Sequence, residues 1–258
     1  MPQQTYRHYQ PAGLLSGLLQ MSPGTIDLVK VIALLVMLVD HANTLFLMPA
    51  RLEFYSLGRM AFPLFTFVWA MNLSHPPARL QIRANRLWLW AFLTQPVFLL
   101  AFRHTQPWYA LNILFVFAAV TQLLALTHRF RAGGILAGTI LLAALACPLI
   151  PASYGVPGIL FAVGLAVMFA PAPARLRTAG LLIAATAMPC LNGITHLADR
   201  PLDALTVAIL PTVLLPYLAL RLAVSLMPAG SPRFMPSRFF YYAYAGHLLI
   251  FRLTELWL

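Results

Sequence analysis

A single apolar stretch that carries four ionisable side chains sets the strongest limit on what this chain can fold into. Residues 26–46 are long and apolar enough to cross a bilayer as a helix, yet they include Asp27, Lys30, Asp40 and His41. An ionisable residue left unpaired in hydrocarbon costs several kcal/mol. Because a helix advances about 100° per residue, Asp27, Lys30 and His41 fall within an arc of about 60°, and Asp40 lies about 100° from His41. The helix therefore needs a face that looks into protein or into a water-filled cavity.

The composition of the whole chain indicates a polytopic membrane protein. Its 258 residues are 61% hydrophobic and 9% charged, which is outside the usual range of soluble domains. The net charge of +11 raises the question of a nucleic-acid partner, but the basic residues lie in short spacers between apolar runs, where topology control explains them better. We therefore expect no nucleic-acid partner. Cys147 and Cys190 lie within apolar runs and indicate neither a disulfide framework nor a cysteine metal site.

Apolar runs broken by proline, glycine and arginine predict an all-α bundle of about nine transmembrane spans, with eight to ten as the range. The expected spans are residues 26–48, 57–73, 87–102, 110–127, 133–150, 156–170, 178–191, 204–224 and 239–257. We expect a cytoplasmic or interfacial segment over residues 1–25 and a single integral membrane domain over residues 26–258. Gly134 and Gly138, four residues apart, predict close packing between two helices.

The distribution of arginine predicts the orientation of the bundle. With the N-terminus in the cytoplasm, the arginines on that side are Arg7, Arg79, Arg83, Arg86, Arg129, Arg131, Arg175, Arg177, Arg221, Arg233 and Arg238. The loop arginines that then face outward are Arg51, Arg103 and Arg200. Because positively charged loops favour the cytoplasm, we expect the N-terminus inside the cell and, with nine spans, the C-terminus outside.

Two groups of arginines have both an ordinary and a functional interpretation. Arg59 is expected at the outer edge of the second span, where it either snorkels to the interface or approaches Asp40 and His41 as an anion clamp. A short helix at the cytoplasmic face is expected to place three arginines on one side: Arg79, Arg83 and Arg86. These arginines either control topology and contact anionic lipid, or form a docking patch for a phosphate-rich donor.

Two further polar residues lie within or close to predicted spans. Asn112 falls at the outer end of the fourth span, and His247 lies about eight residues inside the last one, too deep for an interfacial belt. Each residue either makes a hydrogen bond between helices or belongs to a site.

The pair Asp40 and His41 permits acid–base chemistry. A histidine beside a carboxylate in a low-dielectric cavity can act as a general base, with the carboxylate setting its tautomer, which suits acyl transfer to an amine or hydroxyl. The chain has no Gly-x-Ser-x-Gly elbow, Walker loop, GxGxxG fingerprint or His-Glu-x-x-His motif. His41, Asp40 and His247 could bind a metal only if distant helices converge, so we expect no metal site.

Several motifs along the chain together carry a resemblance to a known family. They are Asp27-x-x-Lys30 continuing to Asp40-His41, then Gly58 to Phe65, Arg83 to Pro96, Leu111 to Phe115, and Tyr244 to Leu249 with His247. In this order they resemble the TraX/TrbP family of conjugative-transfer membrane proteins. The opening motif alone is similar to the broader membrane acyltransferase family that modifies polysaccharides. No family motif is visible from Cys147 through Pro232.

The resemblance implies a multi-pass enzyme of the bacterial inner membrane. Such an enzyme N-acetylates the amino terminus of pilin subunits in pilus biogenesis, with acetyl-coenzyme A as co-substrate and no permanently bound cofactor. His41, oriented by Asp40, is then the expected general base on an acceptor amine reached from the outer side, and Arg59 holds the acyl carbonyl or an acceptor carboxylate. Asp27 and Lys30 are expected either to pair with each other or to contact the donor. The residues expected to bind substrate or donor are Asp27, Lys30, Arg79, Arg83, Arg86, Asn112 and His247.

Other function classes stay open at this point. The acceptor of an acyl group could be a glycan or a lipid rather than a pilin. The buried charges could instead form the pathway of a transporter or channel subunit, although no internal repeat is visible. A structural part of the conjugation apparatus could bind pilin without modifying it.

Overall fold

The computed structural model describes residues 21–73, 79–193, 197–236 and 238–257. All regular elements in these ranges are helices, which confirms the predicted all-α class. Most of the N-terminal segment predicted over residues 1–25 lies outside the described residues.

The first described helix, α2, begins and ends as its sequence dictates. It runs over Pro23–Phe46. The side chain of Ser22 accepts a hydrogen bond from the backbone N–H of Thr25 at 3.1 Å, and Pro23 occupies the first helical position, where its missing N–H costs nothing. The whole of the charged stretch therefore lies on one continuous helix.

Each of the nine predicted ranges contains a helix. After α2 the chain forms α3 (Leu52–Gly58), α4 (Ala61–Leu73), α5 (Leu80–Ala101), α6 (Leu114–Phe130), α7 (Ala132–Ser153), α8 (Gly155–Phe169), α9 (Ala174–Ala187), a 3₁₀ turn (Pro189–Leu191), α10 (Pro201–Asp203), a π-helical segment (Ala204–Ile209), α11 (Leu210–Leu226) and α12 (Phe239–Trp257). One expectation is corrected: Arg83 and Arg86 do not lie on a separate short helix but on the first turns of α5, which Arg79 precedes.

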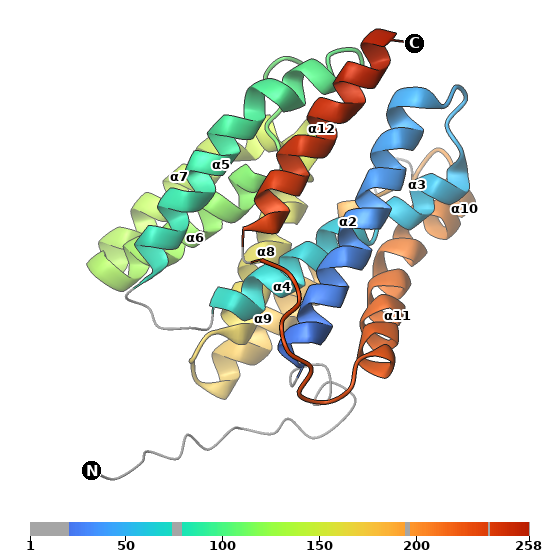
Figure 1. Cartoon of the computed structure of the whole chain (residues 1–258). Coiled ribbons are helices and arrows are strands. Elements are labelled where there is room, and N and C mark those ends of the chain that lie inside the picture. Colours follow the sequence, from blue (N-terminus) through green and yellow to red (C-terminus); the bar gives the residue numbers. More distant parts are fainter. Residues whose placement is uncertain (1–20, 74–78, 194–196, 237, 258) are drawn as a thin grey trace.

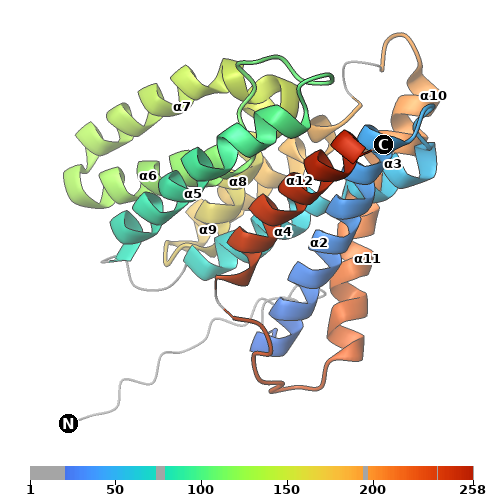
Figure 2. The same ribbon diagram turned by 45° about the horizontal axis from the view of Figure 1, so that its top comes forward.

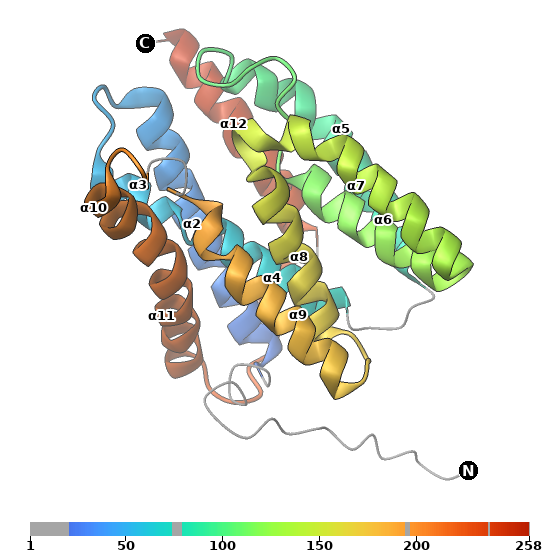
Figure 3. The same ribbon diagram turned by 180° about the vertical axis from the view of Figure 1, so that it is seen from behind.

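The long helices pass back and forth along one direction, so that consecutive helices run antiparallel (Figure 1). Helices α5, α6 and α7 form one group, α8 packs on α9, and α11 lies beside α2 and α3 (Figures 1 and 3). Helices α2, α4 and α12 run between these groups, with α12 contacting both α2 and α5 (Figure 2). The centre of the bundle is therefore lined by helices from both ends of the chain.

The glycines of α7 allow the close packing that their spacing predicts. A side chain at Gly134 would collide with the backbone carbonyl of Leu126 on α6, and one at Gly138 would collide with Leu123. The prediction is confirmed, and it explains how α6 and α7 approach each other so closely.

Among the described residues, two helical stretches are long and apolar enough to cross a membrane by length and composition. They are Ala132–Ser153 and the continuous stretch Pro201–Leu226. Only 17% of the most apolar window of the first is buried within the protein. Its exposed surface includes Ile135, Leu136 and Ile140, each more than half exposed. An apolar helix with so little protein cover fits a hydrocarbon environment better than water.

Candidate functional site

A cavity of about 460 Å³ lies at the centre of the bundle. Its walls come from α2, the end of α3, α4, α5, the start of α6, the joint between α7 and α8, the segment before α12 and the start of α12. The residues that α2 contributes are Lys30, Leu34, Met37, Asp40 and His41. Lys30, Leu34, Met37 and His41 are three or four positions apart and therefore lie along one side of the helix, and Asp40 lies at the edge of that side. Of the polar face predicted for the first span, Lys30 and His41 line this cavity, with Met37 between them.

One end of the cavity is strongly basic. Lys30, Arg83, Arg86 and Arg233 line it. Arg83 donates a hydrogen bond from Nη1 to the carbonyl of Asn72 on α4, which fixes its position. Burial, together with the like charges of Arg79 and Arg86, lowers the pKa of the Arg83 guanidinium. An anion bound at this end would relieve that repulsion.

The opposite end of the cavity contains a pair of histidines from the two ends of the chain. Nδ1 of His41 on α2 lies 2.8 Å from Nε2 of His247 on α12, and the two rings stack with their centroids 5.1 Å apart. Phe102 packs edge-on against His41, and Phe251 packs edge-on against His247. His41 lines the cavity, whereas the buried His247 lies behind it.

The hydrogen bonds of this pair define the tautomers of both neutral rings. Nδ1 of His247 lies 3.0 Å from the carbonyl oxygen of Ala243, which can only accept, so this nitrogen carries a proton. Nε2 of neutral His247 is then unprotonated and accepts a hydrogen bond from Nδ1 of His41. Nε2 of His41 is consequently left with a free lone pair, as a general base requires. The structure thus corrects the prediction that Asp40 orients His41, because His247 does so.

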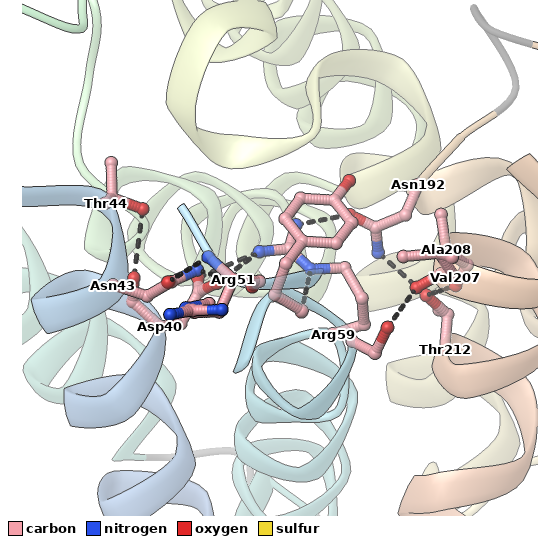
Figure 4. A network of polar contacts seen from close by, with 11 residues as sticks. Asp40, Asn43, Thr44, Arg51, Arg59, Asn192, Val207, Ala208 and Thr212 are labelled. Carbon is pink, nitrogen blue, oxygen red and sulfur yellow. Dashed lines mark hydrogen bonds and ion pairs between the residues drawn. The ribbon is translucent and has the colours of Figure 1, made fainter. Parts of the chain in front are cut away.

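Asp40 is instead paired with Arg59. Nη2 of Arg59 lies 2.8 Å from both carboxylate oxygens of Asp40 (Figure 4). The other two nitrogens of the guanidinium are also engaged: Nη1 donates to Oδ1 of Asn192 at 2.7 Å, and Nε donates to the carbonyl of Tyr55 at 3.0 Å. Asn192 in turn donates to the hydroxyl of Thr212 at 2.9 Å. The predicted approach of Arg59 to Asp40 is confirmed. The predicted anion clamp is corrected, because Arg59 does not line the cavity and its donors are engaged within the protein.

The close approach of Asp40 to α3 depends on glycine. A Cβ at Gly58 would overlap the side chain of Asp40. Residue 58 must therefore lack a side chain for the carboxylate to reach Arg59. This explains why glycine directly precedes the arginine.

Asp27 holds a loop in place at the basic end. It is fully buried, and its Oδ2 accepts hydrogen bonds from the backbone N–H groups of Phe234 at 3.2 Å and Met235 at 3.1 Å. Its Oδ1 accepts from Nζ of Lys30 at 3.0 Å. Of the two expected roles, pairing with Lys30 is confirmed. Because Asp27 fastens the segment that carries Arg233, it shapes the basic end of the cavity without lining it.

Asn112 makes hydrogen bonds that hold two helices together. It is fully buried, its Nδ2 donates to the carbonyl of Ala91 at 2.9 Å and to Oε1 of Gln95 at 2.8 Å, and its Oδ1 accepts from the N–H of Leu114. The side chain therefore joins α5 to the start of α6. Of the two readings that the sequence left open, the link between helices is the one that the structure supports, because Asn112 does not line the cavity.

Arg233 and Tyr154 are two of the cavity residues that the sequence reasoning missed. Arg233 lies in a proline-rich segment, and Tyr154 lies in the stretch that carries no family motif. The position of Arg233, shortly before a span that contains a deep histidine, was the available signal for the first. Tyr154 had no signal, because a tyrosine between two apolar runs is ordinary at a membrane interface. Arg79, by contrast, is exposed and lies outside the cavity wall.

Comparison with known proteins gives a consistent match along the chain. The family model described as TraX protein matches residues 25–255. A protein named Protein TraX from Escherichia coli is 39% identical over 240 residues, which cover 92% of this chain and 89% of that protein. Another Protein TraX, from Escherichia coli strain K12, is 38% identical over 239 residues with the same coverage. No solved structure matches the chain.

Proposed function

The chain belongs to the TraX family, and on this premise we propose that it is a membrane-embedded acetyltransferase for conjugative pilus biogenesis. The acceptor is the amino terminus of a pilin subunit, and the donor is acetyl-coenzyme A. One observation carries the proposal: a single cavity has four cationic side chains at one end and His41 at the other. This arrangement suits a long donor with an anionic head and a reactive tail.

The length of the cavity supports a thioester donor. Lys30 and His41 are both on α2, and a rise of 1.5 Å per residue separates their Cα atoms by about 16 Å along the helix. Phosphate groups bind well to lysine and arginine at the basic end. The extended arm of coenzyme A then follows the cavity past Leu34 and Met37, and the acetyl group reaches His41. Coenzyme A thus has its charged part at the basic end and its thioester beside the base.

The reaction follows from the free lone pair of His41. The acceptor amine attacks the carbonyl carbon of the thioester, and Nε2 of His41 takes the proton that the nitrogen loses. The new C–N bond forms, the C–S bond breaks, and the thiolate of coenzyme A leaves and takes up a proton. Nδ1 of His41 keeps its hydrogen bond to His247 throughout, so the ring stays aligned while it carries a positive charge.

We also propose that the bundle crosses the bacterial inner membrane nine times with its N-terminus in the cytoplasm. The alternating direction of the long helices supports this topology (Figure 1). Alternation brings the α6–α7 turn with Arg131, the start of α9 with Arg175 and the start of α5 to one end of the bundle. Reporter fusions test the orientation: fusions after Arg131 should be cytoplasmic, and fusions after Arg103 should be periplasmic. The reverse pattern would contradict it.

The experiment that tests the activity uses purified protein in liposomes. Acetyl-coenzyme A labelled in the acetyl group is supplied with a peptide that has the amino-terminal sequence of the pilin, and a matched peptide with a blocked amino terminus is the control. We expect label on the free peptide alone. Labelling of both peptides would exclude the amino terminus as the acceptor, and labelling of lipid or glycan alone would assign the transferase a different acceptor. Absence of transfer to any of these acceptors would contradict the proposed activity.

A further inference from the structure

Tyr154 occupies an unusual backbone conformation at the joint between α7 and α8. Its φ angle is +66°, and Gly155 follows with a φ of +50°. Glycine or asparagine usually fills such a left-handed position at a helix end, because other side chains meet steric resistance there. A tyrosine with positive φ is held by its surroundings, and residues of this kind concentrate at functional sites.

Aromatic packing holds the Tyr154 ring in one orientation. The ring stacks on Phe62 of α4 with centroids 4.6 Å apart and planes inclined by 18°. Phe62 is buried and also contacts Phe117 on α6 and Phe161 on α8. Because residues of α6 and α8 support Phe62, the tyrosine ring has a rigid backing. Tyr154 itself lines the cavity.

The hydroxyl of Tyr154 is available for a ligand. Within the described part of the chain this hydroxyl makes no hydrogen bond. The neighbouring residue Ser153 donates a hydrogen bond to the carbonyl of Leu111, just before α6 begins, and this end of the bundle is opposite the start of α5 with its arginines. Tyr154 therefore lies at the same end of the cavity as His41, which directly follows Asp40 on α2.

Acyl transfer requires a hydrogen-bond donor that the histidine pair does not supply. When the amine attacks the thioester, negative charge develops on the carbonyl oxygen, and a preorganised donor there lowers the barrier. Arg59 is the cation next to His41, but Asp40, Asn192 and the carbonyl of Tyr55 engage its donors. The arginines that line the cavity lie at its basic end, near Lys30. Lys30 is about three helical turns away from His41 along α2.

We propose that Tyr154 is a catalytic residue whose hydroxyl donates a hydrogen bond to the carbonyl oxygen of the bound acyl group. The inference rests on the proposed function and assigns Tyr154 the part that the sequence suggested for Arg59. The hydroxyl keeps its proton throughout the reaction. It stabilises the oxyanion that forms when the amine adds, and the oxyanion returns to a carbonyl when the thiolate leaves.

The test compares Tyr154→Phe with wild-type protein and with Tyr242→Phe in the liposome assay. Phenylalanine keeps the stacking on Phe62 and removes only the hydroxyl, and Tyr242 is 60% exposed and does not line the cavity. We expect kcat of Tyr154→Phe to fall by about 10²-fold, the effect of losing one oxyanion donor, while KM for acetyl-coenzyme A stays unchanged. Tyr242→Phe should match wild type.

Two further measurements separate the possible failures. Thermal unfolding and binding of coenzyme A show that Tyr154→Phe is folded with an intact donor site, and we expect both to match wild type. A loss of binding together with turnover would overturn the catalytic role in favour of a structural one. Full kcat in Tyr154→Phe would overturn the inference alone, whereas an inactive wild-type protein would overturn the proposed function and this inference with it.

Discussion

His247 accepts a hydrogen bond from His41 across 2.8 Å, and this contact joins the last helix of the chain to the first described one. Replacing His247 with alanine removes the acceptor and frees the His41 ring to rotate. We expect kcat for acetyl transfer to fall by about 10²-fold with little change in KM, because a misaligned base transfers protons poorly. His247→Gln, whose amide oxygen can accept in place of Nε2, should retain more activity than His247→Ala. Equal, full kcat in both variants would show that His247 does not position the base.

The basic end of the cavity predicts a separate effect on donor binding. Hydrogen bonds to charged groups contribute about 1.5–3 kcal/mol, so Arg83→Gln or Arg86→Gln should raise KM for acetyl-coenzyme A about tenfold or more while kcat changes little. Arg79→Gln is the matched control, because Arg79 is a neighbour on the same segment that does not line the cavity. Steady-state kinetics over a range of donor concentrations measure the effect. A larger effect at Arg79 than at Arg83 would place the phosphates elsewhere.

Asp27 predicts a change in stability. Its carboxylate accepts hydrogen bonds from Phe234, Met235 and Lys30 in a fully buried position. Asp27→Ala leaves those donors without a partner, so we expect the free energy of unfolding to fall by about 1–3 kcal/mol for each donor that water cannot reach. Asp203→Ala, at an exposed residue, is the control. Thermal unfolding in detergent measures the difference, and equal stability of the two variants would exclude the fastening role.

Replacing Arg59 with lysine distinguishes a structural ion pair with Asp40 from a clamp that binds an anionic substrate. Lysine keeps the charge but cannot make the divergent hydrogen bonds to Asp40, Asn192 and Tyr55, so Arg59→Lys should lower the unfolding temperature. KM for the donor should stay close to wild type in whatever protein remains folded. An unchanged unfolding temperature together with a raised KM would instead support the clamp that the sequence suggested.

Much of the fold followed from the sequence because apolar runs and their breaks are local signals. Each range expected to be a span contains a helix, and Lys30 and His41 of the polar face predicted for the first span line a cavity. Orientation and membrane insertion remain predictions, supported by the arginine distribution. The exact extent of α5 was missed because the arginines before its apolar part suggested a separate surface helix, although arginine is a good helix former.

The site was harder to predict because its partners come from distant parts of the chain. Adjacent residues suggested that Asp40 orients His41, but neighbours on a helix point about 100° apart. Asp40 turns instead to Arg59, and His41 turns to His247, which is 206 positions away. Tyr154 stands out only through its backbone conformation and its stacking on Phe62, which the structure shows. These are tertiary facts that no spacing in the sequence reveals.

The most direct test of the account is the intact mass of the pilin from cells that carry wild-type protein, His41→Ala or neither. His41→Ala removes the base but leaves the paired Arg59 and Asp40 in place, and immunoblots of membranes confirm equal protein levels. We expect the pilin to gain the mass of one acetyl group at its amino terminus with wild-type protein alone. Full acetylation with His41→Ala would contradict His41 as the base, and an unmodified pilin with wild-type protein would contradict the proposed acceptor.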